Sequence, residues 1–415
     1  MPVETDRTRE FKRASFAEVL AWIDRHVIRL PAEHVPVAEA AGRVLAEEVR
    51  AAIDLPPVDR AAADGFALRA DETVGASGYN PLPFSLVSDP DELPSGSAAR
   101  IASGEPLPRG ADAVVRLEHV EPHGSGVVSV IEPVIPGNEV ERAASHLARG
   151  SLIASAGQQL GAPHIGLLAA AGPVYPFVVR RPRVRCLLAG RNLVPAGRPQ
   201  SPGATRDVDG PLLRALIERD GGTLAGECTY EQGHSGIARL LAAPNADIVL
   251  VVGATGPATD DHAAAALAET GSIAVHGVAL RPGETAGCGQ SATGTPVFLL
   301  PGAPFACLWA YELLAGRAIR RLGGRNPELP FARRERRMAG KIVSEIGMTE
   351  VRAVRCLPDG SIEPLASFAE AGLAAAAHAD GFVIVPEDSE GFGQGARIAV
   401  YLYDERALAM DAATL

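Results

Sequence analysis

The stretch Asp247–Asp261, which reads Asp-Ile-Val-Leu-Val-Val-Gly-Ala-Thr-Gly-Pro-Ala-Thr-Asp-Asp, decides the fold of this chain. Its apolar run Ile248–Val252 predicts a strand buried on both faces, which is typical of a central parallel strand between two layers of helices. Gly253 and Gly256 allow a tight turn after this strand and a close approach to a ligand. Backbone N–H groups at such a turn can bind a phosphate, and ligands of open α/β sheets bind at this edge. The loop is therefore predicted to bind an anionic ligand; the alternative is a plain strand–loop–helix joint.

The surrounding region, from about Pro182 to Gly324, alternates predicted strands with predicted helices. Such alternation is typical of a doubly wound α/β sheet with right-handed crossovers. Rigid loops at Gly253, Pro282 and Pro301 are expected on one edge of this sheet, where together they indicate a pocket. The other expected strands are Arg183–Leu188, Gly222–Cys228, Ala274–Leu280 and Pro296–Leu300, and the expected helices are Gly210–Arg219, Ser235–Ala242, Ala263–Thr270 and Phe305–Leu322.

The regions before this domain have different sequence patterns. Ser15 is expected to cap a helix that starts at Phe16, with Glu18 at the capping-box position, and a second helix is expected near Val37–Val44. From Ala51 to about Val134, short apolar runs are interrupted by Pro, Gly and Asp, which indicates a β-rich region. Its expected strands are Phe84–Val87, Ala113–Arg116 and Gly126–Ile131.

The C-terminal part, from Asn326 onwards, opens with the basic stretch Arg333–Arg337. A small β-barrel or sandwich is expected to follow it. The expected strands are Met338–Ser344, Val351–Leu357, Gly381–Val385 and Arg397–Tyr403.

Composition limits the classes of function. A chain of 415 residues is too long for one compact core and predicts about two to four domains. The net charge of −11 argues against a nucleic-acid binder, but local arginines and backbone amides can still bind an anionic small molecule. Five cysteines without a CxxC pair, a polar N-terminus and an apolar stretch at Ile165–Val179 that prolines interrupt predict a soluble, cytoplasmic protein with no membrane segment.

Several short motifs concentrate turn residues, acids and small residues. Pro56–Ala67 contains the turn pair Asp64-Gly65, and Ser103–Val115 is a rigid loop that runs into a strand. Arg281–Thr285 and Leu300–Pro304 are Pro-Gly loops at expected strand ends. Such loops fix backbone geometry for a ligand at a low entropy cost.

Taken in order, these segments resemble the molybdopterin molybdenumtransferase family, known as MoeA in bacteria and as the gephyrin E domain in animals. The family's Met-Asp-Gly-Tyr-Ala stretch is similar to Ala63–Ala67, and its Thr-Gly-x-x-(Leu/Val)-Pro-x-Gly-Ala-Asp-Ala-Val-Val segment is similar to Ser103–Val115. Its Lys-Pro-Gly-Lys-Pro and Leu-Pro-Gly-Asn-Pro loops correspond to Arg281–Thr285 and Leu300–Pro304. The resemblance covers essentially the whole chain and identifies it as a divergent member.

The resemblance implies a multidomain α/β plus β fold. A helical linking domain would comprise residues 14–50 and 136–181, and a β-rich extended domain residues 51–135. A doubly wound molybdopterin-binding α/β domain would comprise residues 182–325, and a small C-terminal β-barrel residues 326–415. It also implies a homodimer whose site lies between the α/β domain of one subunit and the β-rich domain of the other.

The implied reaction inserts molybdate into adenylylated molybdopterin and releases AMP, with Mg²⁺ as the assisting cation. A molybdoenzyme or an adenylyltransferase is a further implied partner. Asp64 and Asp261 are the expected catalytic residues, and Asp261 is also the expected metal ligand. The expected ligand-binding residues are Ser103, Gly190, Asp207, Gly253, Thr255, Gly256, Arg281, Pro282, Gly283, Pro301, Gly302 and Pro304.

Departures from the family pattern concern mainly its acids. The family's Thr-Gly-Asp-Glu-Leu reads Ala189–Leu193 here, so Arg191 and Asn192 replace the Asp-Glu pair. Glu284 stands where the family's second loop lysine does. The Gly-Ala-Thr-Gly-Pro segment, which contains Thr255, is close to the Gly-Gly-Thr-Gly-Pro loop of the related molybdopterin adenylyltransferases.

Two functions therefore remain open at the level of sequence. The chain is either an active molybdenumtransferase, in which acids such as Asp209, Glu231 or Asp260 replace those that are lost, or a non-catalytic homologue. Such a homologue would bind molybdopterin or the molybdenum cofactor and act as a carrier or scaffold. A third alternative is a purely structural dimer.

Overall fold

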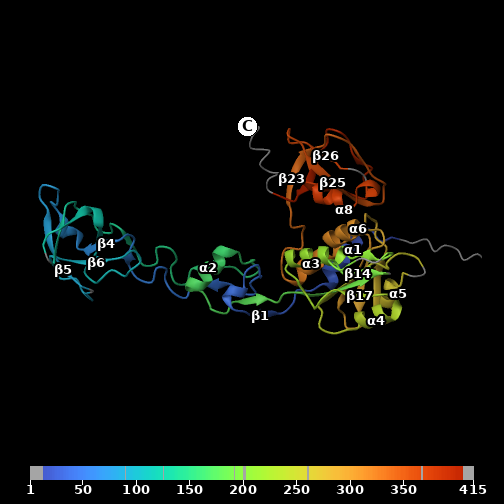
Figure 1. Ribbon diagram of the computed structural model, residues 1–415, viewed down its shortest axis with the longest axis horizontal. Coiled ribbons are helices and arrows are strands. Elements are labelled where there is room, and N and C mark those ends of the chain that lie inside the picture. Colours follow the sequence, from blue (N-terminus) through green and yellow to red (C-terminus); the bar gives the residue numbers. More distant parts are fainter. Residues whose placement is uncertain are drawn as a thin grey trace, which may run out of the picture. The chain divides into compact units, whose positions relative to one another are not determined.

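The computed structural model describes residues 13–88, 90–124, 126–190, 192–199, 202–258, 261–365 and 368–404. They form two compact units, one of residues Ala32–Val178 and one of residues Met1–Pro31 with Val179–Leu415 (Figure 1). Each unit has its own clusters of buried apolar side chains. Among the described residues, no helix combines the length and the apolar character that crossing a membrane requires.

A seven-stranded mixed sheet forms the centre of the α/β domain. Five strands are parallel to one another, while β21 is antiparallel to β22 and β19 is antiparallel to β21. The strands lie in the order β16 (Thr223–Leu224), β13 (Arg183–Ala189), β18 (Ile248–Val252), β22 (Pro296–Leu300), β21 (Gly287–Ser291) and β19 (Gly271–His276), and β17 (Thr229–Glu231) also pairs with β13.

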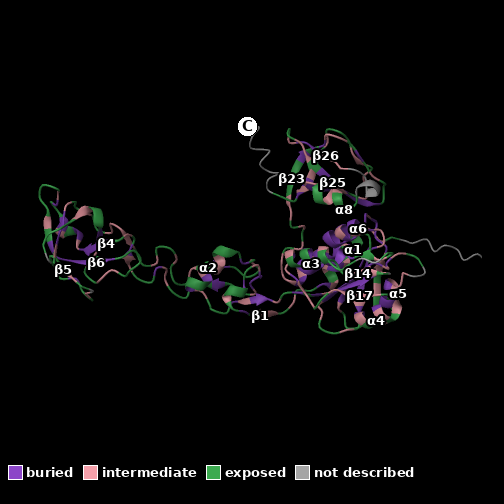
Figure 2. Ribbon diagram, in the orientation of Figure 1, coloured by how far each residue is buried: buried purple, intermediate pink, exposed green. Residues whose placement is uncertain are grey.

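Helices cover both faces of this sheet, as the apolar run Ile248–Val252 predicts. All five residues of β18 are buried. Buried residues fill the interior of this domain (Figure 2). Ile248, Leu250 and Val252 belong to one apolar cluster, and Val249 and Val251 belong to another on the opposite face. The first cluster includes side chains of α1 (Phe16–His26), α3 (Asp209–Arg219), α6 (Pro304–Ala310) and α7 (Gly316–Leu322), and the second those of α4 (His234–Leu241) and α5 (Ala263–Thr270). The predicted doubly wound fold is confirmed.

Helix α1 has the predicted capping box, in which Glu18 N donates to Ser15 Oγ at 3.2 Å and Ser15 N donates to Glu18 Oε2 at 2.7 Å. Its buried residues Val19 and Ile23 belong to the core of the α/β domain. Residues 14–50 are predicted to belong to the linking domain, whereas α1 packs with the α/β domain because its apolar stripe meets that core.

The second helix predicted in the N-terminal region, at Val37–Val44, is wrong. Only one 3₁₀ turn, η1 (Val37–Glu39), forms there. Gly42 follows with φ 71°, a left-handed backbone conformation that an α-helix does not contain. The chain therefore turns away before a second helical turn is complete.

The unit Ala32–Val178 contains a six-stranded sheet and a region around one helix. The three strands predicted in the β-rich region are confirmed in position. The sheet order is β7 (Ala113–Arg116), β4 (Gly65–Leu68), β6 (Ser97–Ile101), β5 (Leu82–Val87), β9 (Val127–Val130) and β8 (Val120–Pro122).

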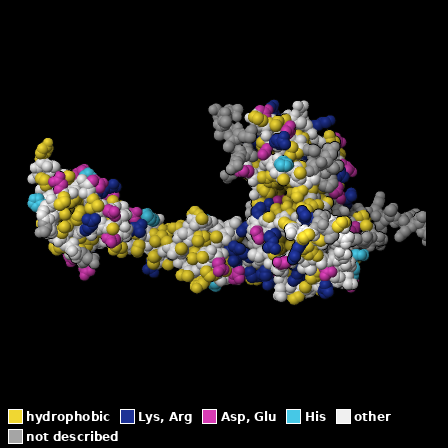
Figure 3. All heavy atoms as spheres, viewed as in Figure 1, with side chains coloured by type: hydrophobic (Ala, Val, Ile, Leu, Met, Phe, Trp, Pro, Cys, Tyr) yellow, Lys and Arg dark blue, Asp and Glu magenta, His cyan; other side chains and the backbone are white. Residues whose placement is uncertain are grey.

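Helix α2 (Ala162–Ala171) lies in the other part of this unit, and many hydrophobic side chains are visible on the surface there (Figure 3). Leu152, Val174 and Tyr175 are 46%, 68% and 59% exposed. Exposed apolar side chains gathered in one region are typical of an interaction surface.

The C-terminal domain is a second six-stranded sheet, with an additional two-stranded pair. The predicted strand Gly381–Val385 is confirmed, and Val351–Leu357 and Arg397–Tyr403 are present with shifted ends. The predicted strand Met338–Ser344 is wrong, because only Ile342 and Val343 form a short strand there. The basic stretch Arg333–Arg337 proves to be an edge strand that pairs with β29. The sheet contains β20 (Leu280–Arg281), β25 (Thr349–Cys356), β27 (Gly381–Val385), β29 (Arg397–Leu402), β23 (Ala332–Arg337) and β26 (Ile362–Pro364), and the pair is β24 (Ile342–Val343) with β28 (Gly391–Phe392).

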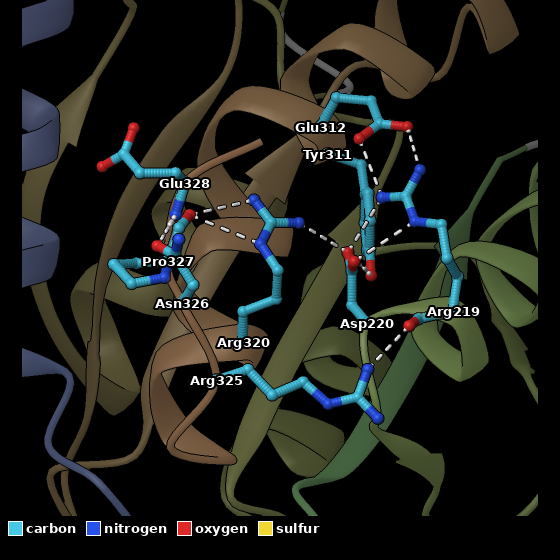
Figure 4. A network of polar contacts seen from close by, with 9 residues as sticks. All are labelled: Arg219, Asp220, Tyr311, Glu312, Arg320, Arg325, Asn326, Pro327 and Glu328. Atoms are coloured by element: carbon cyan, nitrogen blue, oxygen red, sulfur yellow. Dashed lines mark hydrogen bonds and ion pairs between the residues drawn. The ribbon is translucent and has the colours of Figure 1, made fainter. Parts of the chain in front are cut away.

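A buried ionic network lies between α3, the π-helical segment η4 (Tyr311–Ala315) and α7 (Figure 4). Arg219 Nη1 lies 2.6 Å from Glu312 Oε1, and Arg320 Nη1 lies 2.9 Å from Asp220 Oδ2. Asp220 and Glu312 are 1% and 3% exposed. Two cations therefore neutralise two buried carboxylates inside the domain.

The same network reaches the connection to the C-terminal domain. Arg320 Nη2 donates to the Pro327 carbonyl at 3.1 Å, and the Arg219 guanidinium lies 5.3 Å from the centre of the Phe331 ring. Phe331 in turn contacts Phe382 of β27 edge to face, at 5.4 Å between ring centres. The ionic network thus supports the packing of the C-terminal sheet against the α/β domain.

Candidate functional site

The carboxyl ends of β13, β18 and β22 meet at a closely packed glycine pair. Gly253 N donates to the Leu300 carbonyl at 2.9 Å, and Gly253 adopts φ 81°. A Cβ atom on Gly253 would lie 2.3 Å from the Ala189 carbonyl oxygen, and one on Gly302 would lie 3.0 Å from Gly253 Cα. Gly253 therefore requires glycine, and a Cβ atom on Gly302 would fit only tightly. Two of the three loops predicted to share this edge, those at Gly253 and Pro301, lie side by side here.

Thr255 fixes the loop that follows β18. Its side chain is buried, and its Oγ1 lies 3.1 Å from Thr285 Oγ1. His276 Nε2 donates to the Thr255 carbonyl at 2.9 Å. The predicted ligand loop is thereby attached to the end of β19 and to the loop that contains Arg281.

Asp261 lies against the second glycine of this loop. Its Oδ2 accepts the Ala258 N–H at 3.2 Å, and a Cβ atom on Gly256 would lie 2.5 Å from the same oxygen. Asp260, a proposed replacement acid, lies outside the described residues. The structure therefore places the predicted Asp261 carboxylate beside the predicted Gly256 turn.

The predicted strand Ala274–Leu280 is wrong at both ends, and the loop at Pro282 does not follow a strand of the α/β sheet as predicted. Strand β19 ends at His276, and Gly277 turns the chain with φ 93°. Leu280 and Arg281 then pair with β25 of the C-terminal sheet, not with the α/β sheet. The loop returns to the α/β sheet at β21, and Thr285 thereby reaches Thr255.

Arg281, the predicted anion-binding cation, has carboxylate partners within the chain. Its Nε donates to Glu284 Oε1 at 3.1 Å, and its Nη2 lies 3.0 Å from Glu345 Oε2. Partial burial opposes the charge of Arg281, but the two carboxylates outweigh it and raise the pKa of Arg281 above its ordinary value. Pro282 and Gly283 are buried beside it.

The loop after β22 leads directly into α6. Pro301 follows the strand and Pro304 is the first residue of the helix, where its missing N–H costs no hydrogen bond. Ala303 precedes the helix without a side-chain cap. The first N–H groups of α6 therefore have no capping side chain at this edge.

Asp207, predicted to bind the ligand, uses its carboxylate inside the domain. It is 4% exposed, and it accepts the Gly210 N–H and the Tyr230 hydroxyl, each at 2.8 Å. A cavity of about 420 Å³ lies beside it, with Tyr230 and Arg214 in its lining. Asp207 thus positions the start of α3 and Tyr230 at the wall of this cavity.

Asp209 lies next to this carboxylate and is 9% exposed. Burial, together with the charge of Asp207, raises the pKa of Asp209 to about 7, while a hydrogen bond with Cys307 acts in the opposite direction. Within the described ranges, Asp209 Oδ1 has no hydrogen-bond partner. Asp209 is therefore a buried acid that is close to half-protonated at neutral pH.

Gly190 and Asn192 follow β13 at the same edge. A Cβ atom on Gly190 would lie 2.7 Å from Leu193 Cδ1, and Asn192 adopts φ 56°. Arg191, which replaces a family acid, lies outside the described residues. This segment continues into β14 (Leu193–Val194), which pairs with β15 (Thr205–Arg206) just before Asp207.

Asp64 and Ser103 lie in the other unit, Ala32–Val178, and contact each other there. Ser103 N donates to Asp64 Oδ1 at 2.8 Å, and Ser103 Oγ donates to the Ala62 carbonyl at 3.1 Å. A cavity of about 330 Å³ is lined by Asp64, Arg100 and Glu105, among others. The predicted site residues therefore fall into two groups, one in each unit.

The described residues offer few ligands for a metal ion. Among the described residues, no three His, Cys, Asp or Glu side chains form a group that could hold a metal ion. Glu231, a proposed replacement acid, is paired with Arg239 at 2.6 Å. Among the described residues, the protein would therefore contribute one carboxylate, that of Asp261, to a Mg²⁺ ion. Phosphate oxygens of the ligand and water would complete the coordination shell.

Two residues at this site, Tyr230 and His276, are not among the predicted site residues. Tyr230 lies at the cavity wall, and His276 holds the Thr255 loop. His276 is the last residue of a strand, and a polar residue at a strand's carboxyl end is a recognisable feature of α/β sites. Tyr230 follows no such pattern, since its role depends on contact with Asp207.

Comparison with known proteins identifies the family of two regions of the chain. The MoeA N-terminal region (domains I and II) matches residues 14–172, and a family described as "Probable molybdopterin binding domain" matches residues 185–321. These two matches define a multidomain protein that joins a MoeA-type N-terminal region to an α/β domain of the molybdopterin-binding class.

Relatives that match most of the chain identify its family. The molybdopterin molybdenumtransferase of Nostoc sp. is 32% identical over 307 residues, 70% of each chain, and molybdopterin molybdenumtransferase 2 of Mycobacterium tuberculosis is 28% identical over 394 residues, covering 88% of this chain and 94% of that one. The crystal structure of the molybdopterin biosynthesis MoeA protein of Pyrococcus horikosii superposes with a TM-score of 0.73 at 30% identity, over 95% of this chain and 100% of that one. The chain belongs to the MoeA family of molybdenum cofactor biosynthesis proteins.

Proposed function

We propose that this protein is a cytoplasmic molybdenumtransferase that inserts molybdate into adenylylated molybdopterin and releases AMP. The observation that carries the proposal is the contact of Gly253 with Gly302 at the carboxyl edge of the α/β sheet. It lets the loops after β18 and β22 lie side by side, so that the N–H groups of both loops can meet one phosphate-bearing ligand. The curated relatives named molybdopterin molybdenumtransferase support the same reaction.

Within this proposal, the loop residues bind and orient the ligand. The Gly253–Gly256 turn and the start of α6 offer N–H groups to phosphate oxygens. Arg281 supplies the positive charge for an oxyanion, and Asp261 holds Mg²⁺ together with the ligand's phosphate. A bound Mg²⁺ would supply charge neutralisation at the phosphoanhydride that is cleaved.

A homodimer is part of the proposal because the predicted residues fall in two units. Asp64 and Ser103 of one subunit would then complete the site at the α/β domain of the other. The exposed apolar side chains around α2, among them Val174 and Tyr175, support a subunit contact in that region.

The second candidate is a non-catalytic carrier of molybdopterin or of the finished cofactor. It is favoured by the substitution of the family's Asp-Glu pair by Arg191 and Asn192, and by the internal pairing of Glu231. Both features leave binding elements in place while they reduce the number of acids near the loop.

A single experiment separates these functions. The purified protein is titrated with molybdopterin and with adenylylated molybdopterin, and AMP release is followed with molybdate and Mg²⁺ present. A transferase is expected to bind both ligands and to release AMP in proportion to the cofactor formed. Tight binding without AMP release would establish the carrier, and failure to bind either pterin would eliminate both candidates.

The Asp261→Asn variant tests the proposed cation ligand. We expect the Mg²⁺-dependent part of adenylylated-molybdopterin affinity to fall about tenfold, the scale of one lost charge-assisted contact. Calorimetric titration with and without Mg²⁺ measures it, and Glu269→Gln on α5, whose side chain is 65% exposed, is the matched control. If Asp261→Asn binds as tightly as the wild type in both buffers, Asp261 has no such role.

A further inference from the structure

Glu284 places its carboxylate on two donors that the sequence predicts for an external anion. Its Oε1 accepts from Arg281 Nε at 3.1 Å, and its Oε2 accepts from Gly283 N at 3.0 Å. The Glu284 side chain is 26% exposed, so much of it is enclosed. One carboxylate therefore bridges a guanidinium and a backbone N–H, as an oxygen pair of phosphate or molybdate would.

The Nε and Nη2 atoms of Arg281 form the edge of the guanidinium that is best suited to an oxyanion. Arginine binds planar or tetrahedral anions through two parallel N–H groups, and Nε with Nη2 form one such pair. In Arg281, Nε contacts Glu284, and Nη2 lies 3.0 Å from Glu345 Oε2. Two different carboxylates thus share the edge that one oxyanion would use.

The charge balance at this loop opposes an incoming anion. Arg281 contributes one positive charge, and Glu284 and Glu345 contribute two negative charges within 3.1 Å of it. Like charges at such distances repel unless one of them leaves. Glu345 lies 66% exposed on the loop between β24 and β25, so it can exchange its partner for water, whereas Glu284 is attached at both oxygens.

The backbone of the loop holds this arrangement in place. Gly283 adopts φ 138°, and a Cβ atom there would lie 3.0 Å from Leu280 Cδ2. The Gly283 N–H is therefore fixed in direction by a buried loop, and it serves any acceptor that reaches it. Only rotation of the Glu284 side chain frees this donor and Arg281 Nε together.

We propose that the Glu284 carboxylate is an internal anion that occupies the oxyanion-binding position of the Arg281–Thr285 loop, and that it sets the oxyanion affinity of this protein. An external tetrahedral oxyanion binds there only when Glu284 rotates away. Glu284 is thus a specificity-determining residue, and Glu345 is a weaker second competitor. The inference rests on the proposed function only in that this loop receives an oxyanion.

The test compares oxyanion binding by four proteins, namely the wild type, Glu284→Gln, Glu345→Gln and Glu363→Gln. Glu363 forms a comparable exposed ion pair with Arg355 at 3.6 Å in the C-terminal domain and is the control. Equilibrium dialysis measures molybdate and, separately, phosphate. We expect at least tenfold tighter molybdate binding for Glu284→Gln, about twofold to threefold for Glu345→Gln, and no change for Glu363→Gln.

Two additional variants make the result specific to this loop. Glu284→Ala keeps the test valid if the glutamine amide itself stays on Gly283 N, and it is expected to show the same gain. Adding Arg281→Gln to Glu284→Gln is expected to abolish the gain. Thermal melting of each variant verifies that it is folded.

Molybdopterin titration of the same proteins separates this inference from the proposed function. If folded Glu284→Gln and Glu284→Ala bind molybdate no better than the wild type, while molybdopterin binds normally, the internal-anion inference is overturned and the proposed function stands. If the gain appears but no variant binds molybdopterin, the internal anion is supported and the proposed function fails. If molybdate binding stays tighter after Arg281→Gln is added to Glu284→Gln, the oxyanion binds elsewhere, and the inference is also overturned.

Discussion

Replacement of Arg219 by alanine is expected to lower the free energy of unfolding by about 3–5 kcal/mol, the range measured when one partner of a buried ion pair is removed. Arg219 donates two hydrogen bonds to Glu312, at 2.6 and 2.8 Å, and it also contacts Asp220. Without the guanidinium, Arg320 remains as the nearest cation for two carboxylates that are almost fully buried. The Phe331 ring also loses its cationic neighbour.

Urea unfolding of Arg219→Ala and of the control Arg355→Ala measures this effect. Arg355 forms an exposed pair with Glu363, so its removal is expected to change stability by less than about 0.5 kcal/mol. The double variant Arg219→Met/Glu312→Leu is expected to regain most of the loss, because no uncompensated charge remains at that pair. Equal stability of Arg219→Ala and the wild type would show that this ionic network does not stabilise the fold.

Asp209→Asn is expected to stabilise the protein most at pH 8 and clearly less at pH 5. The pKa of Asp209 is raised to about 7 by burial and by the charge of Asp207, against an ordinary value of 3.8. The folded state therefore keeps a proton that the unfolded state loses, and stability falls as the pH rises from about 4 to about 7. The slope is at most about 1.4 kcal/mol per pH unit, so the total effect is on the order of a few kcal/mol.

The measurement is the free energy of unfolding of both proteins at pH 5, 6, 7 and 8. The stabilisation of Asp209→Asn over the wild type is expected to grow with each step and to level off above pH 7. Asp359→Asn is the control, because the pKa of that exposed carboxyl is lowered and the window from pH 5 to 8 lies above it. Parallel curves for Asp209→Asn and the wild type would mean that Asp209 titrates normally.

The parts of the fold that were predictable have strong local patterns. Ile248–Val252 could only be a strand covered on both faces, and Ser15 with Glu18 could only begin a helix. Strand β21 was missed because Gly287-Cys288-Gly289-Gln290-Ser291 has almost no strand propensity. It is a strand for a tertiary reason, since Cβ atoms on Gly287 and Gly289 would lie 2.6 and 2.1 Å from carbonyl oxygens of β19.

The candidate site was predictable in its backbone and less so in its side chains. Gly253, Gly302 and Thr255 lie where loops after parallel strands must lie, and the structure brings them together. The contact of Arg281 with Glu345 joins residues that are 64 positions apart in sequence (345 − 281) and belong to two domains. Pairings of that kind follow from how the C-terminal sheet packs, which no local pattern of the sequence contains.

Through strand β20, the loop that contains Arg281 is held by two domains. Leu280 and Arg281 take their strand pairing from Thr349 and Glu350 of the C-terminal sheet, while Thr285 is held by the α/β domain. A substitution in β25 can therefore displace Arg281 without altering any residue of the Arg281–Thr285 loop.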